Sequence, residues 1–331
     1  MITLQANATS INSFDAGEAS PISGLRFLWL ELANVCNLHC THCYAESGPH
    51  PDRADLLSTA DFKRLLREAA DIGCRAVQFI GGEATLHPGL PQLIAYARHL
   101  EYEFVEVYTN ARRLPSALLA CFVQHSVSLA VSIYADEAAV HDTVTRRRGS
   151  HARTIANVKK LVDAGLDVRV GVIAMDANAG RIEPTLAFIR DLGVQRVAVD
   201  QARGIGRGAD VTRGEAGLQA LCGSCWKGKL CIAPDGVVST CIMSKAWPVG
   251  TVLDSGLADL VESASLRDVR QMIRDRVWEP RHAADRNDPT MCERSPCNPD
   301  GCPPDLICHP SDPPCQPDNP YCVPDTRLSH H

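Results

Sequence analysis

Cys36-Asn-Leu-His-Cys40-Thr-His-Cys43 is the most informative stretch of this chain, and it follows an apolar run over residues 25–33 that is typical of a buried strand. Three thiolates spaced x3 and then x2 on one loop can surround a single metal centre. A 4Fe–4S cluster has four irons, so three cysteines leave one iron without a protein ligand. Structural metal sites are normally closed, whereas an open position is typical of sites that perform chemistry. The loop therefore indicates a reactive iron–sulfur cluster.

The same loop also contains His39 and His42, which leaves a zinc site open as an alternative. Zinc prefers a tetrahedron of ligands and accepts cysteine and histidine at such short spacings. The loop alone favours a cluster without excluding a single ion. A second motif further along the chain is needed to choose between them.

The composition is that of a soluble globular protein, because 45% of the 331 residues are hydrophobic and 22% are charged. This length exceeds one typical domain and suits a barrel with a smaller appendage. The formal net charge of −6 argues against a general nucleic-acid-binding protein. Arg146-Arg147-Arg148 is the only basic cluster, and it is too short to indicate a membrane-binding patch.

The chain has 15 cysteines but no recognisable export signal. No apolar run approaches the roughly 18–20 residues that are needed to cross a bilayer. The first residues lack the basic start and the apolar centre of a signal peptide. Because the cytosol keeps thiols reduced, cysteines in a chain of this kind indicate metal binding rather than disulfides. We therefore expect a cytoplasmic protein that contacts no membrane.

Short apolar runs alternate with amphipathic segments, a pattern typical of parallel βα units. The expected strands are 25–33, 76–80, 104–109, 129–134, 168–174 and 194–199. The expected helices are 59–70 after an N-cap at Ser58, 90–100, 115–125, 154–164 and 181–192. Six units are too few for an eight-fold barrel. The sequence therefore predicts an α/β fold with a partial (β/α)6 TIM-like barrel, whose functional groups lie at the carboxyl ends of the strands.

The alternation stops after Gly204-Ile-Gly206-Arg207-Gly208, which matches no phosphate-binding loop and which we interpret as a linker. Two short apolar runs then flank Pro234-Asp235-Gly236 and predict a β-hairpin. A helix is expected over residues 257–274. The predicted organisation is a flexible lead-in over 1–24, the barrel over 25–210, a hairpin with a helix over 211–288, and a cysteine-rich tail over 289–331.

The tail is rich in Cys, Pro and Asp, and a short Cys-x-Pro-Asp-like unit recurs in it. Its cysteines are Cys292, Cys297, Cys302, Cys308, Cys315 and Cys322. Proline at this density prevents helix and disfavours sheet, so the tail has no regular structure of its own. In a reducing compartment we expect metal to bind some of these cysteines, and a disordered tail is the alternative.

Gly81-Gly82-Glu83 follows the second expected strand. Two glycines let a backbone approach a ligand closely, and the glutamate adds an acceptor for a cation. Together with the CxxxCxxC loop, this motif resembles the signature of the radical S-adenosylmethionine (radical SAM) enzymes. The resemblance implies a 4Fe–4S cluster on Cys36, Cys40 and Cys43, with S-adenosylmethionine on its free iron. In that family an electron from the cluster splits S-adenosylmethionine and yields a 5′-deoxyadenosyl radical.

The same resemblance implies a set of contacts with the cofactor, in which Glu83 grips the methionyl ammonium and His42 lies beside the adenine. The expected cofactor-binding residues are His42, Gly81, Gly82, Glu83, Asn110, Ser132, Arg146 and Arg148. The sequence departs from the family at Ala84, where proline is frequent, and at Ala111, where glycine is frequent. Several of these residues are equally compatible with ordinary polar groups at a barrel rim. Cys74 and Cys121 are expected to be unreactive thiols.

The hairpin resembles the SPASM/twitch extension of radical SAM enzymes, in which a cysteine-bearing hairpin holds an auxiliary iron–sulfur cluster. The resemblance assigns Cys225, Cys231 and Cys241 as ligands. Cys222 is their neighbour, and the resemblance leaves open whether it is a ligand too. A full SPASM domain continues as C-x2-C-x5-C-x3-C, whereas the cysteine spacings of the tail here are x4, x4, x5, x6 and x6. We therefore expect one or two auxiliary clusters, without individual assignments in the tail.

The leading hypothesis is a radical SAM enzyme that oxidatively modifies a ribosomally synthesised peptide in natural-product maturation, by crosslinking, thioether formation or dehydrogenation. The first alternative is a dehydrogenase or epimerase acting on a sugar, aminocyclitol or nucleoside. The second is a non-catalytic iron–sulfur or zinc protein. An electron donor such as flavodoxin or ferredoxin is an expected partner. A separate leader-peptide-binding protein is another, because few residues precede the first strand.

Overall fold

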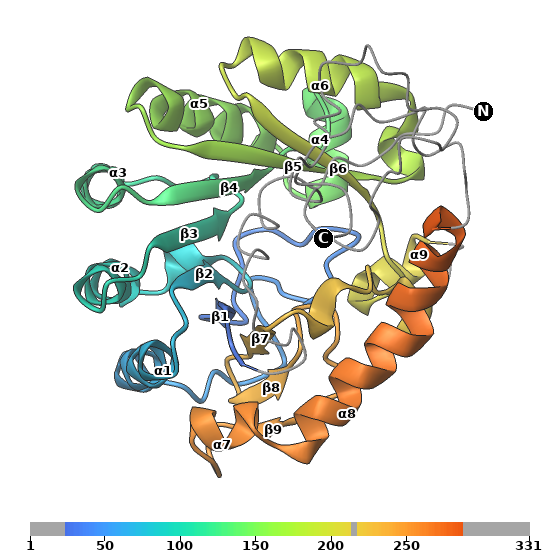
Figure 1. Ribbon diagram of the computed structural model, residues 1–331. Coiled ribbons are helices and arrows are strands. Elements are labelled where there is room, and N and C mark those ends of the chain that lie inside the picture. The colour runs from blue at the N-terminus through green and yellow to red at the C-terminus, as the bar shows by residue number, and fades with distance from the viewer. Residues whose placement is uncertain (1–23, 213–216, 287–331) are drawn as a thin grey trace, which may run out of the picture. The chain divides into compact units, whose positions relative to one another are not determined.

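A sheet of nine strands organises the chain up to Val277 in the computed structural model, which describes residues 24–212 and 217–286 (Figure 1). The strand order is β6-β5-β4-β3-β2-β1-β7-β8-β9. The strands are β1 (Phe27–Glu31), β2 (Ala76–Ile80), β3 (Phe104–Thr109), β4 (Ser128–Ser132), β5 (Val168–Ala174), β6 (Arg196–Gln201), β7 (Lys229–Ile232), β8 (Val237–Ser239) and β9 (Gly250–Thr251). The first six run parallel in consecutive order, which confirms the predicted α/β fold with its six parallel strands, although no α-helix follows β6.

Helices follow each of the first five strands and cover the outer face of the sheet (Figure 1). They are α1 (Thr59–Asp71), α2 (Leu90–His99), α3 (Ser116–Gln124), α4 (Ala138–Thr145), α5 (Ser150–Asp163) and α6 (Ile182–Asp191). Short 3-10 turns lie at Ala84–Leu86, Asp176–Arg181, Gly206–Asp210, Gly217–Ala220 and Ser224–Trp226. The prediction missed α4 and began α5 four residues late, because the short, partly β-branched sequence of α4 gives little helical periodicity.

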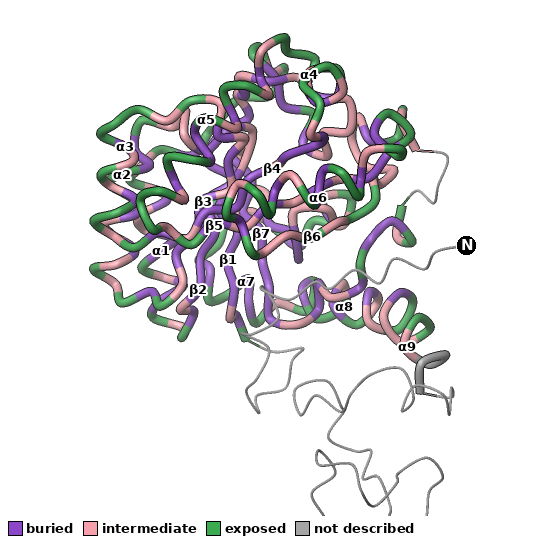
Figure 2. Tube along the Cα trace, turned by 90° about the horizontal axis from the view of Figure 1, so that it is seen from above, coloured by how far each residue is buried: buried purple, intermediate pink, exposed green. Residues whose placement is uncertain are grey.

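The core lies between this helical layer and the strands, and Figure 2 shows the strands buried beneath helices whose outer turns are exposed. Strands β1 and β2 are buried along their whole length, as strands covered on both faces should be. On α1 the buried face is formed by Phe62, Leu65 and Leu66, none of which has exposed surface. Ser58 caps this helix as predicted, because its hydroxyl accepts a hydrogen bond from the Asp61 amide at 3.2 Å.

The predicted hairpin is confirmed, and it is continuous with the barrel sheet. Strand β7 runs parallel to β1, with Phe27 opposite Lys229, while β8 pairs with β7 in the antiparallel sense. The extension therefore adds its cysteine-bearing strand directly to the strand that precedes the cysteine loop. The predicted domain boundaries at residues 24, 210 and 288 stay predictions.

The helix expected over residues 257–274 is wrong as a single element. The chain forms α7 (Leu257–Val261) and α8 (Ala264–Ile273), and Ser263 interrupts them by capping α8 through a 3.1 Å bond from the Leu266 amide to its hydroxyl. Serine favours this capping role over a place inside a helix. A π-helical turn at Arg274–Trp278 and a helix α9 (Glu279–Arg286) follow. The second compact unit begins at Trp278.

A buried polar layer crosses the inside of the sheet. Glu106 on β3 has no exposed surface, and both its oxygens accept hydrogen bonds at 2.7 Å from Arg169 on β5. Gln78 on β2 donates to the same carboxylate. A buried ion pair of this kind needs good geometry to offset its desolvation, and the bidentate arrangement supplies it.

No helix in the described ranges is long and apolar enough to cross a membrane.

Gly82 gives a direct test of how the sheet is connected to the cysteine loop. A Cβ atom at this position would lie 2.3 Å from the Val35 carbonyl oxygen, a backbone atom that cannot move aside alone. We expect Gly82→Ala to lower the free energy of unfolding by about 3 kcal/mol, measured by urea denaturation. Gly180→Ala is the matched control, because a Cβ there meets no atom within 4 Å. Equal denaturation midpoints for the two variants would contradict this packing.

Candidate functional site

The cysteine loop leaves the carboxyl end of β1 and is held on two sides by backbone hydrogen bonds. The Cys36 amide donates to the Gly48 carbonyl at 2.8 Å, which closes the loop on itself. The amides of His39 and Thr41 donate to the carbonyls of Thr145 and Val144 at 3.2 and 2.9 Å. The end of α4 therefore fixes the backbone on both sides of Cys40.

The segment interpreted as a linker is instead part of the site, so that prediction is wrong. A Cβ on Gly206 would lie 2.5 Å from the Tyr44 carbonyl oxygen, which shows how closely this backbone packs against the cysteine loop. Between the glycines, the Arg207 guanidinium donates to the Cys40 carbonyl at 2.9 Å and to the Ser47 carbonyl at 2.7 Å. The glycines thus let this backbone come close to the cysteine loop, and Arg207 connects two carbonyls of that loop.

Gly81 and Gly82 lie directly against the start of the cysteine loop. Their missing side chains allow this contact between two backbones, in addition to any approach of a ligand. The Gly82 amide donates to the Ala33 carbonyl at 2.7 Å, and the Glu83 amide donates to the Val35 carbonyl at 3.0 Å. These bonds continue the β1–β2 pairing beyond the ends of both strands. The two motifs that stand far apart in the sequence are therefore one hydrogen-bonded structure.

Glu83 is buried and connects the ends of β2 and β3. Its Oε1 accepts hydrogen bonds from the hydroxyls of Thr85 and Thr109 at 2.6 and 2.5 Å, and its Oε2 accepts one from the Asn110 amide at 2.8 Å. Burial raises the pKa of this carboxyl, while these donors oppose the shift. The Asn110 side chain in turn lies 3.7 Å from the Cys36 sulfur.

A cavity of about 180 Å³ lies at the carboxyl ends of the strands, and it brings most of the predicted residues together. Its lining includes Cys36, Cys40, Cys43, His42, Gly81, Gly82, Glu83, Asn110 and Ser132. Arg146 and Arg148, which were also predicted to contact the cofactor, are not among its lining residues. Arg146 ends α4 in a left-handed conformation and contacts the His39 ring at 3.3 Å on the outer side of the loop.

The cavity also has lining residues that the sequence analysis missed. Tyr108, Tyr134, Ile173 and Gln201 stand at or just beyond the carboxyl ends of β3, β4, β5 and β6. Position at a strand end was the available signal, since functional groups of parallel folds gather there. Met243 follows Cys241 in the extension, and no local sequence pattern indicates that it reaches the cavity.

His42 lies inside the cavity wall, where its ring meets that of Tyr134 edge-on at 4.9 Å. Burial lowers the pKa of this imidazole to about 4, so it is neutral near pH 7. Its Nδ1 atom is buried and has no hydrogen-bond partner among the described residues. A neutral aromatic ring at this position is compatible with stacking beside a purine, as the resemblance predicted.

The hairpin cysteines form a second group of thiols. The sulfurs of Cys225 and Cys241 lie 2.9 Å apart, and Cys222 interacts with the Cys225 thiol as well. Cys231 on β7 is fully buried, and burial raises the pKa of its thiol. The structure therefore brings Cys222, Cys225 and Cys241 together, with Cys231 on β7 of the same hairpin, while the six tail cysteines lie outside the described residues.

A buried ion pair connects the two groups of cysteines. Lys245, four residues after Cys241, reaches Glu31 at the end of β1 with a separation of 2.5 Å. The other oxygen of Glu31 accepts a hydrogen bond from the Tyr44 hydroxyl at 3.0 Å. Because Tyr44 follows Cys43 directly, one carboxylate fixes both the cysteine loop and the extension.

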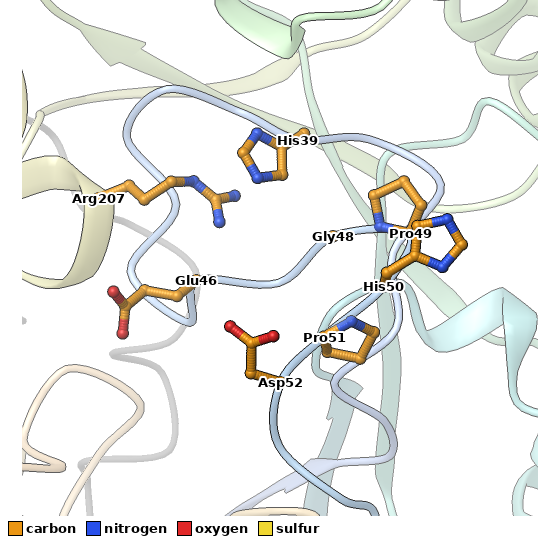
Figure 3. A pocket seen from close by; sticks show the side chains of 8 residues that line it. All are labelled: His39, Glu46, Gly48, Pro49, His50, Pro51, Asp52 and Arg207. Carbon is orange, nitrogen blue, oxygen red and sulfur yellow. The ribbon is translucent and has the colours of Figure 1, made fainter.

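On its outer side the cysteine loop borders a second hollow of about 350 Å³. Figure 3 shows the His39 ring and the Arg207 guanidinium directed toward this hollow, with Asp52 facing them from the opposite wall.

No group of three His, Cys, Asp or Glu side chains in the described ranges is arranged around a single metal ion.

Comparison with known proteins gives a family match for the part of the chain that contains this site. Residues 30–189 match the sequence profile of the Radical SAM superfamily. The chain is 31% identical over 183 residues to the antilisterial bacteriocin subtilosin biosynthesis protein AlbA of Bacillus subtilis, which covers 55% of this chain and 40% of AlbA. It is 27% identical over 183 residues to the sporulation killing factor maturation protein SkfB of the same organism, covering 55% and 43%.

The fold is also similar to a solved structure. Streptococcus suis SuiB bound to S-adenosylmethionine superimposes with a TM-score of 0.63 over 76% of this chain and 68% of SuiB, at 16% identity. This likeness shows that the two chains share a fold. The chain spans less than half of the length of the two curated relatives named above.

Arg207 provides a test of how the cysteine loop is held. Arg207→Gln removes the guanidinium that bonds two loop carbonyls, and each such bond from a charged donor contributes about 1.5–3 kcal/mol. We expect a lower melting temperature and faster proteolysis within residues 36–48. Arg190→Gln is the control, because Arg190 is exposed on α6. Unchanged protease sensitivity of the loop in Arg207→Gln would show that Arg207 does not hold it.

Proposed function

Residues 30–189 of this chain are a radical SAM domain, and we propose that the chain uses it to modify a ribosomally synthesised peptide oxidatively during natural-product maturation. The observation that carries this proposal is the cavity. It exposes Cys36, Cys40 and Cys43 together with residues of the extension, including Met243. A substrate in this cavity would contact both cysteine-bearing regions at once.

The three loop cysteines fit the family's cofactors. Radical SAM domains use a 4Fe–4S cluster and S-adenosylmethionine, which together supply a 5′-deoxyadenosyl radical that abstracts hydrogen. Cys36, Cys40 and Cys43 would hold the cluster, because their spacing places three soft ligands on one cavity wall and leaves one iron without a protein ligand. Burial raises the pKa of Cys40 to about 12, so loading must displace thiol protons.

The other residues of the cavity would orient S-adenosylmethionine. One oxygen of Glu83 accepts from two threonine hydroxyls. Its Oε2 accepts one hydrogen bond, from the Asn110 amide, and could accept another from an ammonium group. The neutral His42 ring would pack beside the adenine, and the Ser132 hydroxyl would bind the ribose. Met243 and Tyr134 would exclude water from the reacting atoms.

The relatives support a peptide as the substrate. AlbA is named for the biosynthesis of a bacteriocin, and SkfB for the maturation of a sporulation killing factor. The family match over residues 30–189 contains the loop cysteines and Glu83. We therefore assign this chain to oxidoreductase-type peptide modification, with crosslinking, thioether formation or dehydrogenation as the outcome. We place it in the cytosol, where a reducing environment preserves iron–sulfur ligands.

An auxiliary cluster on the hairpin would account for the oxidative outcome. The Cys225 and Cys241 sulfurs are in contact, Cys222 interacts with Cys225, and Cys231 lies on β7 of the same hairpin. Loss of an electron from a substrate radical requires an acceptor, and a cluster held by the hairpin cysteines would supply that redox chemistry. The tail cysteines remain predicted ligands, and a low-potential flavodoxin or ferredoxin remains the predicted electron donor.

Replacing the three loop cysteines tests the cofactor assignment. We expect a Cys36→Ala/Cys40→Ala/Cys43→Ala variant to lose about four irons per chain, the content of one cluster, while retaining iron elsewhere. It should form no 5′-deoxyadenosine from S-adenosylmethionine under strong reduction. A Cys74→Ala/Cys121→Ala variant is the control, since neither thiol lines the cavity. Equal iron content in both variants, or a single zinc in the wild type, would remove the proposal.

Replacing hairpin cysteines separates the two clusters. A Cys231→Ser/Cys241→Ser variant should lose iron yet still cleave S-adenosylmethionine, because its loop cysteines are intact. Turnover of a precursor peptide to the oxidised product should fall at least about a hundredfold if the second cluster accepts the electron. Anaerobic iron analysis and mass spectrometry of the peptide measure the two effects. Full product formation without the hairpin iron would exclude an auxiliary cluster from the reaction.

A further inference from the structure

Asn110, the residue after β3, is bonded to both motifs of the site. Its backbone amide donates a hydrogen bond to Oε2 of Glu83 at 2.8 Å. Its side-chain amide donates to the Cys36 sulfur at 3.7 Å and to the Asn37 side-chain oxygen at 2.8 Å. One residue therefore lies between the carboxylate that is proposed to bind an ammonium group and the first cysteine of the loop.

The orientation of the Asn110 side-chain amide follows from its other hydrogen bonds. Its Oδ1 accepts a bond from the Arg112 backbone amide at 2.9 Å, so the oxygen end of the group is already occupied. An asparagine side chain has two N–H donors, and here the Asn37 oxygen and the Cys36 sulfur accept from them. The nitrogen end of the group, rather than the oxygen end, therefore faces the cysteine.

Residues of α5 hold the turn that carries Asn110. The Thr154 hydroxyl donates to the Asn110 carbonyl, and the Asn157 side chain donates to the Ala111 carbonyl, each at 2.8 Å. Ala111 has a φ of 52°, a left-handed conformation that alanine keeps only where the surrounding structure imposes it. These bonds maintain the turn that directs the Asn110 amide toward the cysteine loop.

The surroundings of Cys36 disfavour negative charge on its sulfur. The residue is buried, and burial together with the charge of Glu83 raises the pKa of its thiol. The Leu38 amide, which donates to the sulfur at 3.5 Å, opposes this shift. That donor belongs to the cysteine loop itself, whereas Asn110 reaches the sulfur from the end of β3. The sheet thus supplies a second donor to the same sulfur.

We propose that Asn110 is a positioning residue that sets the reduction potential of the loop cluster through its hydrogen bond to the Cys36 sulfur. The inference rests on the proposed function, because it requires a 4Fe–4S cluster on the three loop cysteines. It gives Asn110 a role that does not depend on contact with S-adenosylmethionine. One electron from a reductant such as dithionite adds negative charge to the cluster and its sulfurs, and no covalent bond forms or breaks. An N–H donor at the sulfur stabilises that charge and so raises the potential.

Two replacements of Asn110 remove the donor to the sulfur. Asn110→Leu has no polar side-chain atom, whereas Asn110→Asp keeps an oxygen that can accept from the Arg112 amide and so preserve the turn. Thr154→Val is the matched control, because it removes the 2.8 Å bond to the Asn110 carbonyl but leaves the side-chain amide in place. The control disturbs the same turn without removing the donor.

Anaerobic titration with dithionite, followed by electron paramagnetic resonance, measures the potential of the loop cluster. The signal of this cluster is the one that is absent from the triple alanine variant of the loop cysteines. No S-adenosylmethionine is added, so a contact between Asn110 and that cofactor cannot contribute to the result.

We expect Asn110→Leu to lower the equilibrium constant for reduction of the loop cluster about tenfold, which for a one-electron couple is a potential about 59 mV more negative. Asn110→Asp should lower the potential further, because a carboxylate beside the sulfur repels the added electron. Thr154→Val should keep the potential of the wild type. All three variants should retain the iron content of the wild type.

An unchanged potential in the two Asn110 variants would overturn the inference, as would an equal shift in Thr154→Val. Loss of iron from both Asn110 variants would also overturn it, because the residue would then only maintain the structure. Each of these results leaves the proposed function in place, since the wild type still holds its loop cluster. A wild type without the signal of that cluster would instead remove the proposed function, and this inference with it.

Discussion

The contact between Gly81-Gly82 and residues 32–35 is the constraint on which the site depends. It exists because glycine alone lets two backbones approach so closely, and two amide-to-carbonyl bonds then extend the β1–β2 pairing past the strand ends. The cysteine loop begins where that pairing stops. Its position relative to Glu83 is thus set by main-chain geometry, which varies less than side-chain contacts.

Other elements hold the same loop from different directions. Backbone bonds from the end of α4 bracket Cys40, and Arg207 spans the loop from the side of β6. Glu83 joins the ends of β2 and β3 beneath it through buried hydrogen bonds. A loop that carries reactive metal ligands needs support of this kind, because ligands on an unsupported loop would not keep one geometry.

The extension is joined to the barrel through both backbone and charge. Strand β7 continues the sheet beside β1, and the Lys245–Glu31 ion pair lies where the two cysteine-bearing regions meet. Glu31 also accepts the Tyr44 hydroxyl, so movement of the extension and movement of the loop are opposed by the same carboxylate. This arrangement explains how residues more than 200 positions apart can form one cavity wall.

Local chemistry was enough to predict the strands, most helices, the hairpin and the two motifs that the fold brings together at the cavity. Apolar runs that alternate with amphipathic segments indicate which strands are buried, and the spacing of cysteines indicates which metal centre they suit. Both inferences need only the sequence, because they depend on residues that are close together in it. The break between α7 and α8, the role of Gly206 and Arg207, and the approach of Met243 to the cavity could not be predicted in this way. Each depends on which distant backbone lies within hydrogen-bonding or van der Waals reach, and that is settled by the packing of the whole sheet.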